Sequence, residues 1–514
     1  MLAFGAGVVR MEGNTNFDSL WWHTHDVPRR PELPGDLTTE IAVVGAGMTG
    51  LTVATLLARA GRRVAVVEAD RIGAGTSGGT SAHVTQVLDH RYHELASKWG
   101  TEGARQVAAS GRAGLERIAA FVDEEGIDCD FARVPGWLYS EKPADVRQIE
   151  DEVETAREIG LEAVRDDRPG LPFPIAAAVR FPDQARFHPV RYLEGLARAA
   201  ERAGAQLYEG TRVRDVEGGD PPRLETDRGV VTAGSVVLAT HTPAGFNLLQ
   251  TAIEPMRSYV LALELDGGAP PPDGLFWDTQ DPYHYTRIQP GPDGPWLIVG
   301  GADHFTGAES HTEDAYRGLE AYAHQRWPTA AVTHRWSSQF YEPIDALPFI
   351  GHTPVARNVY VATGYSGTGL VLATLAGMLL ADELLGRENP WADLYRTRRF
   401  KPLAGGPKFL EMNVGVARHF VGDRLAAREV QDLREVPRGT GRVVDWQGQK
   451  VAVYHEESGA LHAVSAVCTH AFCLVDWNSA EKTWDCPCHG GRYRPDGSVI
   501  EGPPVADLAP VEAE

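Results

Sequence analysis

Cysteine and histidine side chains gather near the end of this 514-residue sequence. Four of its five cysteines lie between positions 468 and 488, and Cys468-Thr-His470 and Cys486-Pro-Cys488-His489 place a histidine beside them. Thiolates and neutral imidazoles suit either a zinc ion or an iron–sulfur centre with two thiolates on one iron and two imidazoles on the other. Zinc loops favour two cysteines, or two histidines, a few residues apart, so Cys-x-His is an unusual zinc loop. The pattern therefore predicts a metal centre and favours iron–sulfur chemistry over zinc.

The region around these residues resembles the Rieske fold, a small all-β domain in which two loops hold a [2Fe–2S] cluster. Short strand-like runs separated by turns begin at about position 436. The resemblance implies that Cys468, His470, Cys486 and His489 bind the irons. It also implies that Cys473 and Cys488 are the family's pair that can form a disulfide, and whether this pair is oxidised stays open. Histidine ligation places such clusters at about −150 to +300 mV, against about −400 mV for all-thiolate ferredoxins.

Three positions near the ligands bear on the potential of the predicted cluster. Ala471-Phe472 stands where the family usually has Leu-Gly, and Gly491 stands where high-potential respiratory members carry a serine that bonds a bridging sulfide. Tyr493 keeps the aromatic hydroxyl that can reach a cluster thiolate. Because losing a hydrogen-bond donor to sulfur lowers the potential, we expect a cluster toward the low end of the Rieske range.

A glycine pattern follows the first strand-like run of the chain. Ile41–Val44 leads into Gly45-Ala-Gly47-Met-Thr-Gly50, a helical stretch, a second strand-like run and then Glu68. Gly45 suits a tight turn, Gly47 lets the backbone approach a pyrophosphate, and Gly50 lets the helix pack closely on the strand. The free N–H groups at the helix start attract phosphate, and the carboxylate of Glu68 can bind a ribose. The sequence predicts a dinucleotide site here.

The next segments resemble the D-amino-acid-oxidase-like (glycine-oxidase-like) flavoprotein superfamily, most closely its subgroup with a C-terminal Rieske domain. The resemblance covers about residues 18–400, and it rests on the loop 69–85, the segment from Phe187 to Val213 and the segment 357–370. It implies FAD as the cofactor, bound by Gly45, Gly47, Met48, Thr49, Gly50, Glu68, Ala69, Arg71, Thr76, Ser77, Thr80, His83, Val213, Thr240, Gly364, Thr368, Gly369 and Leu370.

Two further interpretations concern the flavin's surroundings. His83 lies in a loop that resembles the one by which some dimethylglycine-dehydrogenase-like members attach FAD covalently, although a hydrogen-bonded structural histidine is the simpler interpretation. Tyr259, Tyr285, Arg287 and His304 lie on strand-like segments that, by the resemblance, face the substrate side. Arg287 could clamp a carboxylate through two parallel hydrogen bonds. Each of these four residues could equally be part of the core.

The expected fold is an α/β FAD-binding domain of the Rossmann-like, glutathione-reductase type, interleaved with an α+β antiparallel-sheet substrate domain and followed by a small all-β Rieske domain. We expect an N-terminal extension over 1–39, the flavoprotein over 40–402, a linker over 403–434 and the Rieske domain over 435–514. Within the flavoprotein, the FAD-binding parts are expected at about 40–90, 180–255 and 335–400, and the substrate and cap parts at about 91–179 and 256–334.

Composition excludes several classes of function. The formal net charge of −21 with no basic block argues against nucleic-acid binding, because phosphate binding needs clustered Lys and Arg. No apolar run approaches the roughly 20 residues of a membrane span, and the start lacks a signal-peptide pattern, so we expect a cytoplasmic protein. Cys129 stands apart from the other cysteines and is expected to be an inert buried thiol.

The two centres together imply conversion of two-electron into one-electron chemistry. The resemblance implies oxidation of a C–N bond in a small amine or amino acid, with electrons leaving through the cluster to a one-electron carrier or reaching O2. Reverse flow toward a flavin reductase or monooxygenase, and pure electron transfer without an organic substrate, stay open. We do not expect a Rieske oxygenase, because that class needs a two-His-one-carboxylate iron site after the Rieske domain and no histidine follows His489 in this sequence. The sequence says nothing of the oligomeric state.

Overall fold

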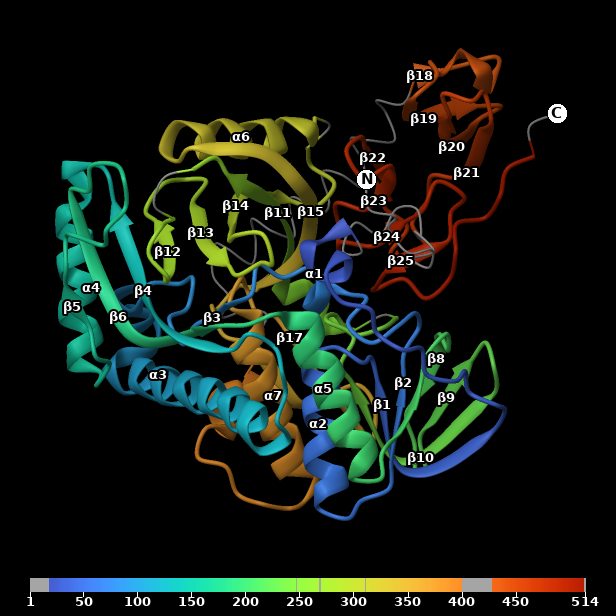
Figure 1. Cartoon of the computed structure of the whole chain (residues 1–514). Coiled ribbons are helices and arrows are strands. Elements are labelled where there is room, and N and C mark those ends of the chain that lie inside the picture. The colour runs from blue at the N-terminus through green and yellow to red at the C-terminus, as the bar shows by residue number, and fades with distance from the viewer. Residues whose placement is uncertain (1–17, 246, 268–269, 310, 400–427, 513–514) are drawn as a thin grey trace.

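The computed structural model describes residues 18–245, 247–267, 270–309, 311–399 and 428–512. Figure 1 shows three regions that pack against one another: a lower α/β region, an upper region built on a long curved sheet, and a C-terminal all-β region beside the upper one. The chain crosses between the first two regions several times, which is the interleaving expected from the sequence.

The lower region is built on an eight-stranded sheet with the order β16-β17-β10-β1-β2-β7 and the hairpin β8–β9 attached to β10. The strands β17, β10, β1, β2 and β7 run parallel, and Ile41 lies opposite both Val64 and Ser235. Their apolar side chains are buried on both faces, as a parallel sheet covered by helices requires. The strands are β1 (Leu37–Val44), β2 (Val64–Val67), β7 (Gln206–Tyr208), β8 (Val213–Glu217), β9 (Arg223–Thr226), β10 (Val230–Leu238), β16 (Phe349–His352) and β17 (Val359–Thr363).

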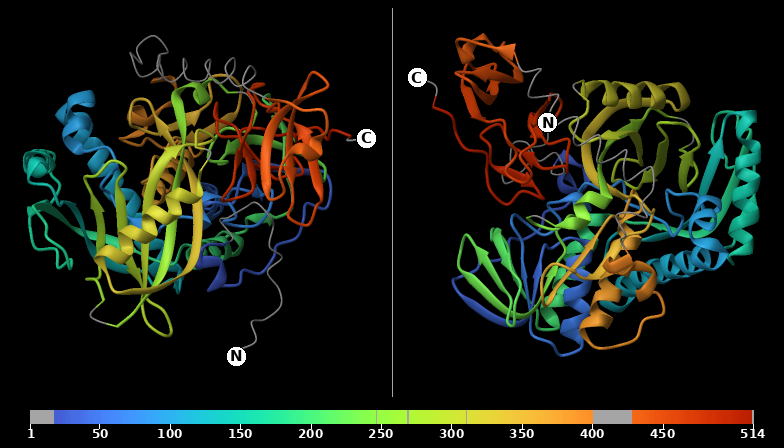
Figure 2. Two further views of the ribbon diagram at one scale, coloured as in Figure 1. Left: turned by 90° about the horizontal axis from the view of Figure 1, so that it is seen from above. Right: turned by 180° about the vertical axis from the view of Figure 1, so that it is seen from behind.

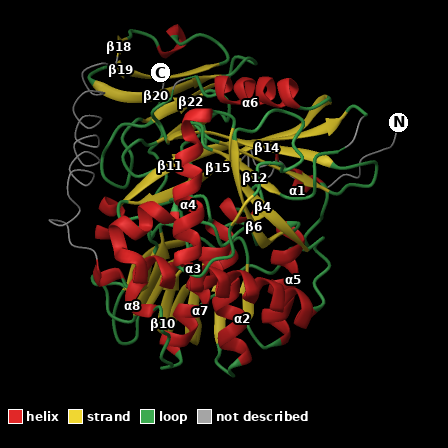
Figure 3. Cartoon of the chain, turned by 90° about the vertical axis from the view of Figure 1, so that its left-hand side faces the viewer, coloured by secondary structure: helices red, strands yellow, loops and turns green. Residues whose placement is uncertain are grey.

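Helices cover this sheet and join it to the second one. Figure 3 shows the helices in red in front of the yellow strands. Helix α2 packs against both α5 and α7, and the long α3 packs against α7, with one break in helical geometry at Gly100. The helices are α1 (Leu20–His23), α2 (Met48–Arg59), α3 (Tyr92–Glu125), α4 (Val146–Glu158), α5 (Pro189–Arg202), α6 (Glu313–Arg326), α7 (Gly369–Leu384) and α8 (Ala392–Tyr395).

The upper region is a nine-stranded sheet with the order β15-β11-β14-β13-β12-β4-β6-β3, and β5 pairs with β6. Its ladders are antiparallel except for β12 beside β4. Helix α6 covers the outer face of β11 and β14, and the opposite face looks toward the α/β region. The strands are β3 (His83–Val84), β4 (Ala132–Ser140), β5 (Val164–Arg165), β6 (Ala177–Arg186), β11 (Ile253–Leu265), β12 (Leu275–Asp278), β13 (His284–Gln289), β14 (Trp296–Phe305) and β15 (Thr329–Pro343).

The C-terminal region consists of two four-stranded sheets, β18-β19-β20-β21 and β22-β23-β24-β25. Both views in Figure 2 place it beside the flavoprotein regions. The strands are β18 (Arg428–Glu429), β19 (Thr440–Trp446), β20 (Gln449–His455), β21 (Leu461–Ser465), β22 (Asp476–Asn478), β23 (Thr483–Asp485), β24 (Arg492–Tyr493) and β25 (Val499–Glu501).

The observed elements cross several of the expected domain boundaries. Strand β6 begins at Ala177 and β15 at Thr329, so the boundaries expected at 180 and 335 cut through strands of the second sheet. Strand β18 belongs to a C-terminal sheet although it precedes position 435, and most of the expected linker lies outside the described residues. Among the helices that the structure describes, none is long and apolar enough to cross a membrane.

Candidate functional site

A cavity of about 340 Å³ lies where the α/β region meets the second sheet. One end is lined by the glycine turn and Glu68, the middle by the loop 74–83, and the far end by the start of α7 and by side chains of β11 and β13. Most of the residues predicted to bind FAD line it: Gly45, Gly47, Met48, Thr49, Glu68, Ala69, Thr76, Ser77, Thr80, His83, Val213, Thr240, Thr368, Gly369 and Leu370. The remaining three, Gly50, Arg71 and Gly364, do not line it.

The two helices that begin at this cavity fit an anionic ligand. Helix α2 begins after Gly47 and α7 after Thr368, and neither is capped by the side chain of its N-cap residue. Their first N–H groups and dipoles therefore favour negative charge in the cavity. A Cβ on Gly50 would lie 1.9 Å from the carbonyl oxygen of Gly45, so Gly50 permits close packing of the turn rather than ligand contact. These features fit the pyrophosphate and flavin ends of FAD.

Charged groups mark the glycine-turn end of the cavity. The carboxylate of Glu68 accepts hydrogen bonds from the backbone N–H groups of Ala46 (2.8 Å) and Asp70 (3.0 Å), and burial raises its pKa. The side chains of Arg212 and Arg494 line the same end, and Arg494 comes from the C-terminal region. Among the described residues these are the only Arg or Lys side chains in the cavity lining, and sequence patterns gave no signal for either.

Arg71 does not face the cavity. Its guanidinium lies over the ring of Trp22, 5.0 Å from the ring centroid, and donates to the carbonyl oxygen of Val27. The N-terminal segment thus binds the guanidinium of Arg71, which we had predicted to bind FAD. A contact with a segment so far back in the chain is not visible from local spacing.

Of the four residues predicted to face the substrate, only Tyr285 lines the cavity. The hydroxyl of Tyr259 lies 3.0 Å from Nε2 of His304, and its ring packs edge-on against Tyr316 of α6. Tyr259 and His304 therefore lie on the α6 face of the sheet, contrary to the prediction. Successive residues of a strand point to opposite faces of the sheet. The prediction was one residue off along β11: it named Tyr259, whereas the neighbouring Ser258 lines the cavity.

Arg287 is also outside the cavity. Its side chain is buried, lies over Trp21, and donates to the carbonyl oxygens of Ser81 (2.8 Å) and Ile288 (3.0 Å) and to Gln289 (2.9 Å). Nε and Nη1 thus bind the protein's own acceptors, whereas Nη2 is buried and has no hydrogen-bond partner among the described residues. Arg287 does not lie where a carboxylate clamp on the substrate would have to be.

His83 lines the cavity, but the protein engages both of its ring nitrogens. Nδ1 lies 3.1 Å from the hydroxyl of Ser81, and Nε2 lies 3.3 Å from the carbonyl oxygen of Thr286. Burial lowers its pKa to about 3, so the ring is neutral and its Nε2–H donates to the carbonyl. This geometry fits the hydrogen-bonded interpretation; covalent attachment stays a prediction.

Two loops of the C-terminal region bring the predicted cluster ligands together. The rings of His470 and His489 lie 4.9 Å apart at 84°, and Nδ1 of each ring is buried. Burial lowers the pKa of each histidine to about 4, so both are neutral and able to bind metal. The free thiols of Cys468 and Cys486 are buried in the same two loops. Two thiols and two inward imidazole nitrogens are the donor set of a Rieske cluster.

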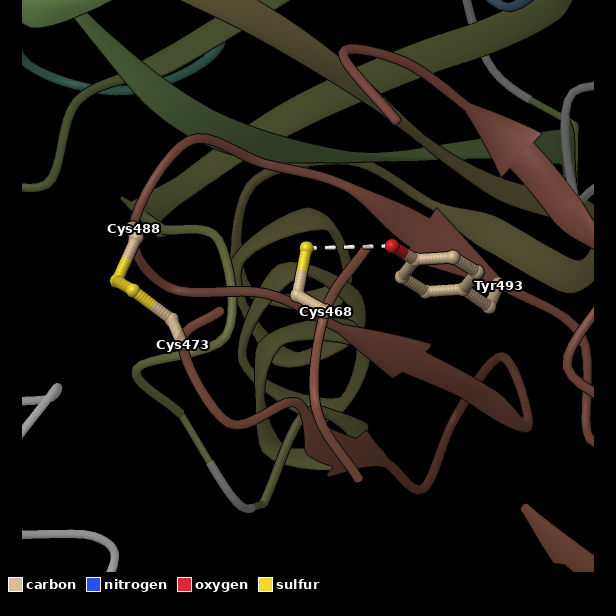
Figure 4. Close-up of a disulfide and its surroundings, with 4 residues drawn as sticks. All are labelled: Cys468, Cys473, Cys488 and Tyr493. Carbon is tan, nitrogen blue, oxygen red and sulfur yellow. Dashed lines mark hydrogen bonds between the residues drawn. A yellow bond between two sulfur atoms is a disulfide. The ribbon is translucent and has the colours of Figure 1, made fainter. Parts of the chain in front are cut away.

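The contacts around these predicted ligands answer the one question about the cysteines that the sequence left open. Cys473 and Cys488 form a disulfide that ties the two loops together (Figure 4), so they are not ligands. The hydroxyl of Tyr493 lies 3.2 Å from Sγ of Cys468, as expected. A Cβ on Gly491 would lie 2.9 Å from Pro504, so this backbone leaves little room for the serine of the respiratory proteins.

The cluster loops pack directly against the cavity. The hydroxyl of Tyr341 lies 3.4 Å from the carbonyl oxygen of His489, and the ring of Tyr341 meets that of His241 with centroids 4.8 Å apart. Both Tyr341 and His241 line the cavity. Gln339 donates to the carbonyl oxygen of Gly490 at 2.9 Å. One layer of side chains thus separates the cavity from a predicted cluster ligand, and no motif in the sequence marks it.

Comparison with known proteins agrees with both predicted cofactors. Residues 40–383 match the family described as FAD dependent oxidoreductase, and residues 427–512 match the Rieske [2Fe-2S] domain. The protein YhfW of Bacillus subtilis, named a Rieske 2Fe-2S iron-sulfur protein, is 31% identical over 97% of this chain and 98% of its own length. Gamma-glutamylputrescine oxidoreductase of Escherichia coli is 26% identical over 72% of this chain and 89% of its own.

A solved structure shares the fold. Glycine oxidase from Geobacillus kaustophilus superposes with a TM-score of 0.60 at 20% identity, over 71% of this chain and 100% of its own. With the fit of the cavity and of the two loops, these matches give the cofactors as FAD and a Rieske cluster. The chain is a member of the FAD dependent oxidoreductase family and carries a C-terminal Rieske [2Fe-2S] domain.

Proposed function

We propose that this protein oxidises a C–N bond of a small amine or amino acid and passes the electrons, one at a time, to its Rieske cluster and then to an external carrier. The observation that carries the proposal is the single layer formed by Tyr341 and His241 between the cavity and the backbone of His489. Bound FAD would supply the two-electron acceptor, and the cluster a one-electron outlet. Relatives named for oxidation of a putrescine derivative and of glycine support an amine or amino acid as the substrate.

The residues around the cavity have separate tasks in this proposal. The starts of α2 and α7 hold the anionic cofactor, and their dipoles favour added negative charge near them. The rings of His83 and His241 are neutral, because burial lowers the pKa of His83 to about 3 and that of His241 to about 4. They therefore add no positive charge to the cavity at neutral pH. Trp277, Tyr283 and Tyr285 line the end of the cavity that we assign to the substrate, where they form an aromatic wall.

The test is anaerobic mixing of the holoenzyme with a panel of amines and amino acids, following flavin absorbance and the cluster's EPR signal. We expect the flavin to bleach first and the reduced-cluster signal to follow. In Cys468→Ser, which lacks one predicted ligand, the flavin should still bleach while the cluster signal is absent. Cluster reduction before the flavin by an external donor, with no bleaching by any amine, would favour reverse flow instead.

A further inference from the structure

The substrate end of the cavity carries a carboxylate and aromatic rings where an amino-acid site would need a cation. Asp89, Ser258, Trp277, Tyr283 and Tyr285 line this end. The backbone N–H of Gly367, in the loop before α7, donates to the carboxylate of Asp89. A Cβ on Gly367 would lie 2.5 Å from that carboxylate, so glycine lets Asp89 sit against the α7 loop.

A second carboxyl group lies behind this wall. Both carboxyl oxygens of Asp303 are buried, and among the described residues neither makes a hydrogen bond of good geometry. Ser258 and Tyr283 lie near enough to lower its pKa, but burial and the charges of Asp89 and Glu342 outweigh them, and the pKa rises to about 7. A cation bound in the neighbouring cavity would stabilise the ionised form of this buried acid.

Cations that could pair with a substrate carboxylate are placed elsewhere. Within the described part of the chain, the only Arg and Lys side chains in the lining are Arg212 and Arg494, at the glycine-turn end. Arg287 is buried against Trp21, and Arg91, whose positive charge acts on Asp89, donates to the carbonyl oxygen of Asp278 at 3.4 Å. An α-carboxylate would thus face Asp89 without a cationic side chain as its partner, whereas an ammonium group would meet a carboxylate and aromatic rings.

We propose that this site takes amines that carry no carboxylate on the reacting carbon, recognised as cations by Asp89, with Asp303 behind it, and by the rings of Trp277, Tyr283 and Tyr285. This proposal rests on the proposed function and makes it narrower. A like charge opposite Asp89 disfavours the amino acid, and attraction to the acid and the rings favours the amine. The discrimination should amount to at least about tenfold in dissociation constant.

The experiment uses matched pairs with the holoenzyme. n-Butylamine is compared with norvaline, and N-methylbutylamine with N-methylnorvaline, so that each pair differs only by the carboxylate. Flavin bleaching is followed anaerobically. In a separate arm, the non-oxidisable ions butyltrimethylammonium and pentanoate are titrated, and their dissociation constants are read from the shift of the flavin spectrum.

We expect the amine of a pair to bleach the flavin at least tenfold more efficiently than its amino acid, and butyltrimethylammonium to bind at least tenfold more tightly than pentanoate. Asp89→Asn should weaken binding of the cation about tenfold and leave pentanoate unweakened. Asp151→Asn, on the exposed face of α4, should change neither.

Three results would overturn the inference. If norvaline or its N-methyl form is oxidised at least as well as the matching amine, the inference fails while the proposed function stands. If no member of any pair bleaches the flavin, the proposed function is in doubt, and the binding arm still decides the inference. Equal or tighter binding of pentanoate, or a cation affinity unchanged in Asp89→Asn, would refute it.

Discussion

A buried ion network joins the Rieske domain to the substrate sheet, and its central residue is Glu481. The side chain of Glu481 is 0% exposed, and those of Arg257 of β11 and Arg492 of β24 are each 1% exposed. Nε of Arg257 donates to Glu481 at 2.9 Å, and Arg492 and the hydroxyl of Ser337 also donate to the same carboxylate. One acid thus holds a cation from each domain.

Glu481→Gln keeps the size of the side chain and removes its charge. Arg257 then has Glu501 as its nearest carboxylate, at 3.8 Å, while Arg492 keeps Asp485 at 3.1 Å and Glu501 at 3.0 Å. Removing one partner of a buried pair costs about 3–5 kcal/mol, because the other charge stays buried. A domain of this size loses about 4 °C or more in melting temperature for each kcal/mol of unfolding free energy. If the whole loss of stability falls on the Rieske domain, its melting temperature should therefore fall by at least about 12 °C.

The assay is thermal unfolding of the holoprotein, followed separately by cluster absorbance and by flavin fluorescence. The wild type should lose both signals together, and Glu481→Gln should lose the cluster first. The control is Glu313→Gln, which breaks a 2.8 Å pair with Arg335 whose side chains are 39% and 50% exposed. That pair should be worth only about 0–1 kcal/mol. If the two variants melt alike, the buried network does not hold the domains together.

Three further predictions concern single side chains. Cys473→Ser removes a disulfide that spans 15 residues and should cost about 3 kcal/mol of unfolding free energy, measured by denaturant titration under oxidising conditions; no difference from the wild type would contradict it. Tyr493→Phe removes the hydrogen bond to Cys468, and this bond favours the reduced form of the cluster. For a bond worth about 1 kcal/mol, the reduction potential of the cluster should fall by roughly 40 mV. A redox titration that shows a higher potential would refute this prediction. Burial raises the pKa of Asp303 to about 7, so the folded state favours the protonated acid and loses stability as the pH rises from about 4 through 7. Asp303→Asn has no such titration, so the difference between its melting temperature and that of the wild type should increase over this pH range. A difference that stays constant with pH would contradict this prediction.

Local spacing was enough to predict which candidate residues lie together within one segment or one small domain. Gly45, Gly47 and Glu68 belong to one strand–turn–helix–strand unit, whose geometry follows from the fold of that unit alone. The pair His470 and His489 belongs to two loops of one small domain. Such sites need no knowledge of how distant segments pack.

The substrate side could not be predicted in the same way, because it depends on strand phase and on distant contacts. Ser258 and Tyr259 are neighbours in an almost uniformly buried strand, so alternation of polar and apolar residues could not show which one faces the cavity. Arg287 packs on Trp21 and Arg71 packs on Trp22. Both tryptophans belong to an N-terminal segment that has no recognisable sequence motif. In both cases, tertiary packing decided the role of a residue whose chemistry alone suggested ligand binding.

The shared cavity wall has a thermodynamic consequence. Arg494 and Glu501 of the Rieske domain line the same cavity as Glu68 and Thr368 of the flavoprotein, so FAD would contact both domains at once. A ligand that binds the docked state better than the undocked state favours docking, and docking raises the affinity for FAD by the same factor. Glu481→Gln should therefore also weaken FAD binding, although Glu481 does not line the cavity. If the variant undocks but keeps its FAD affinity, the Rieske residues in the wall contribute nothing to holding FAD.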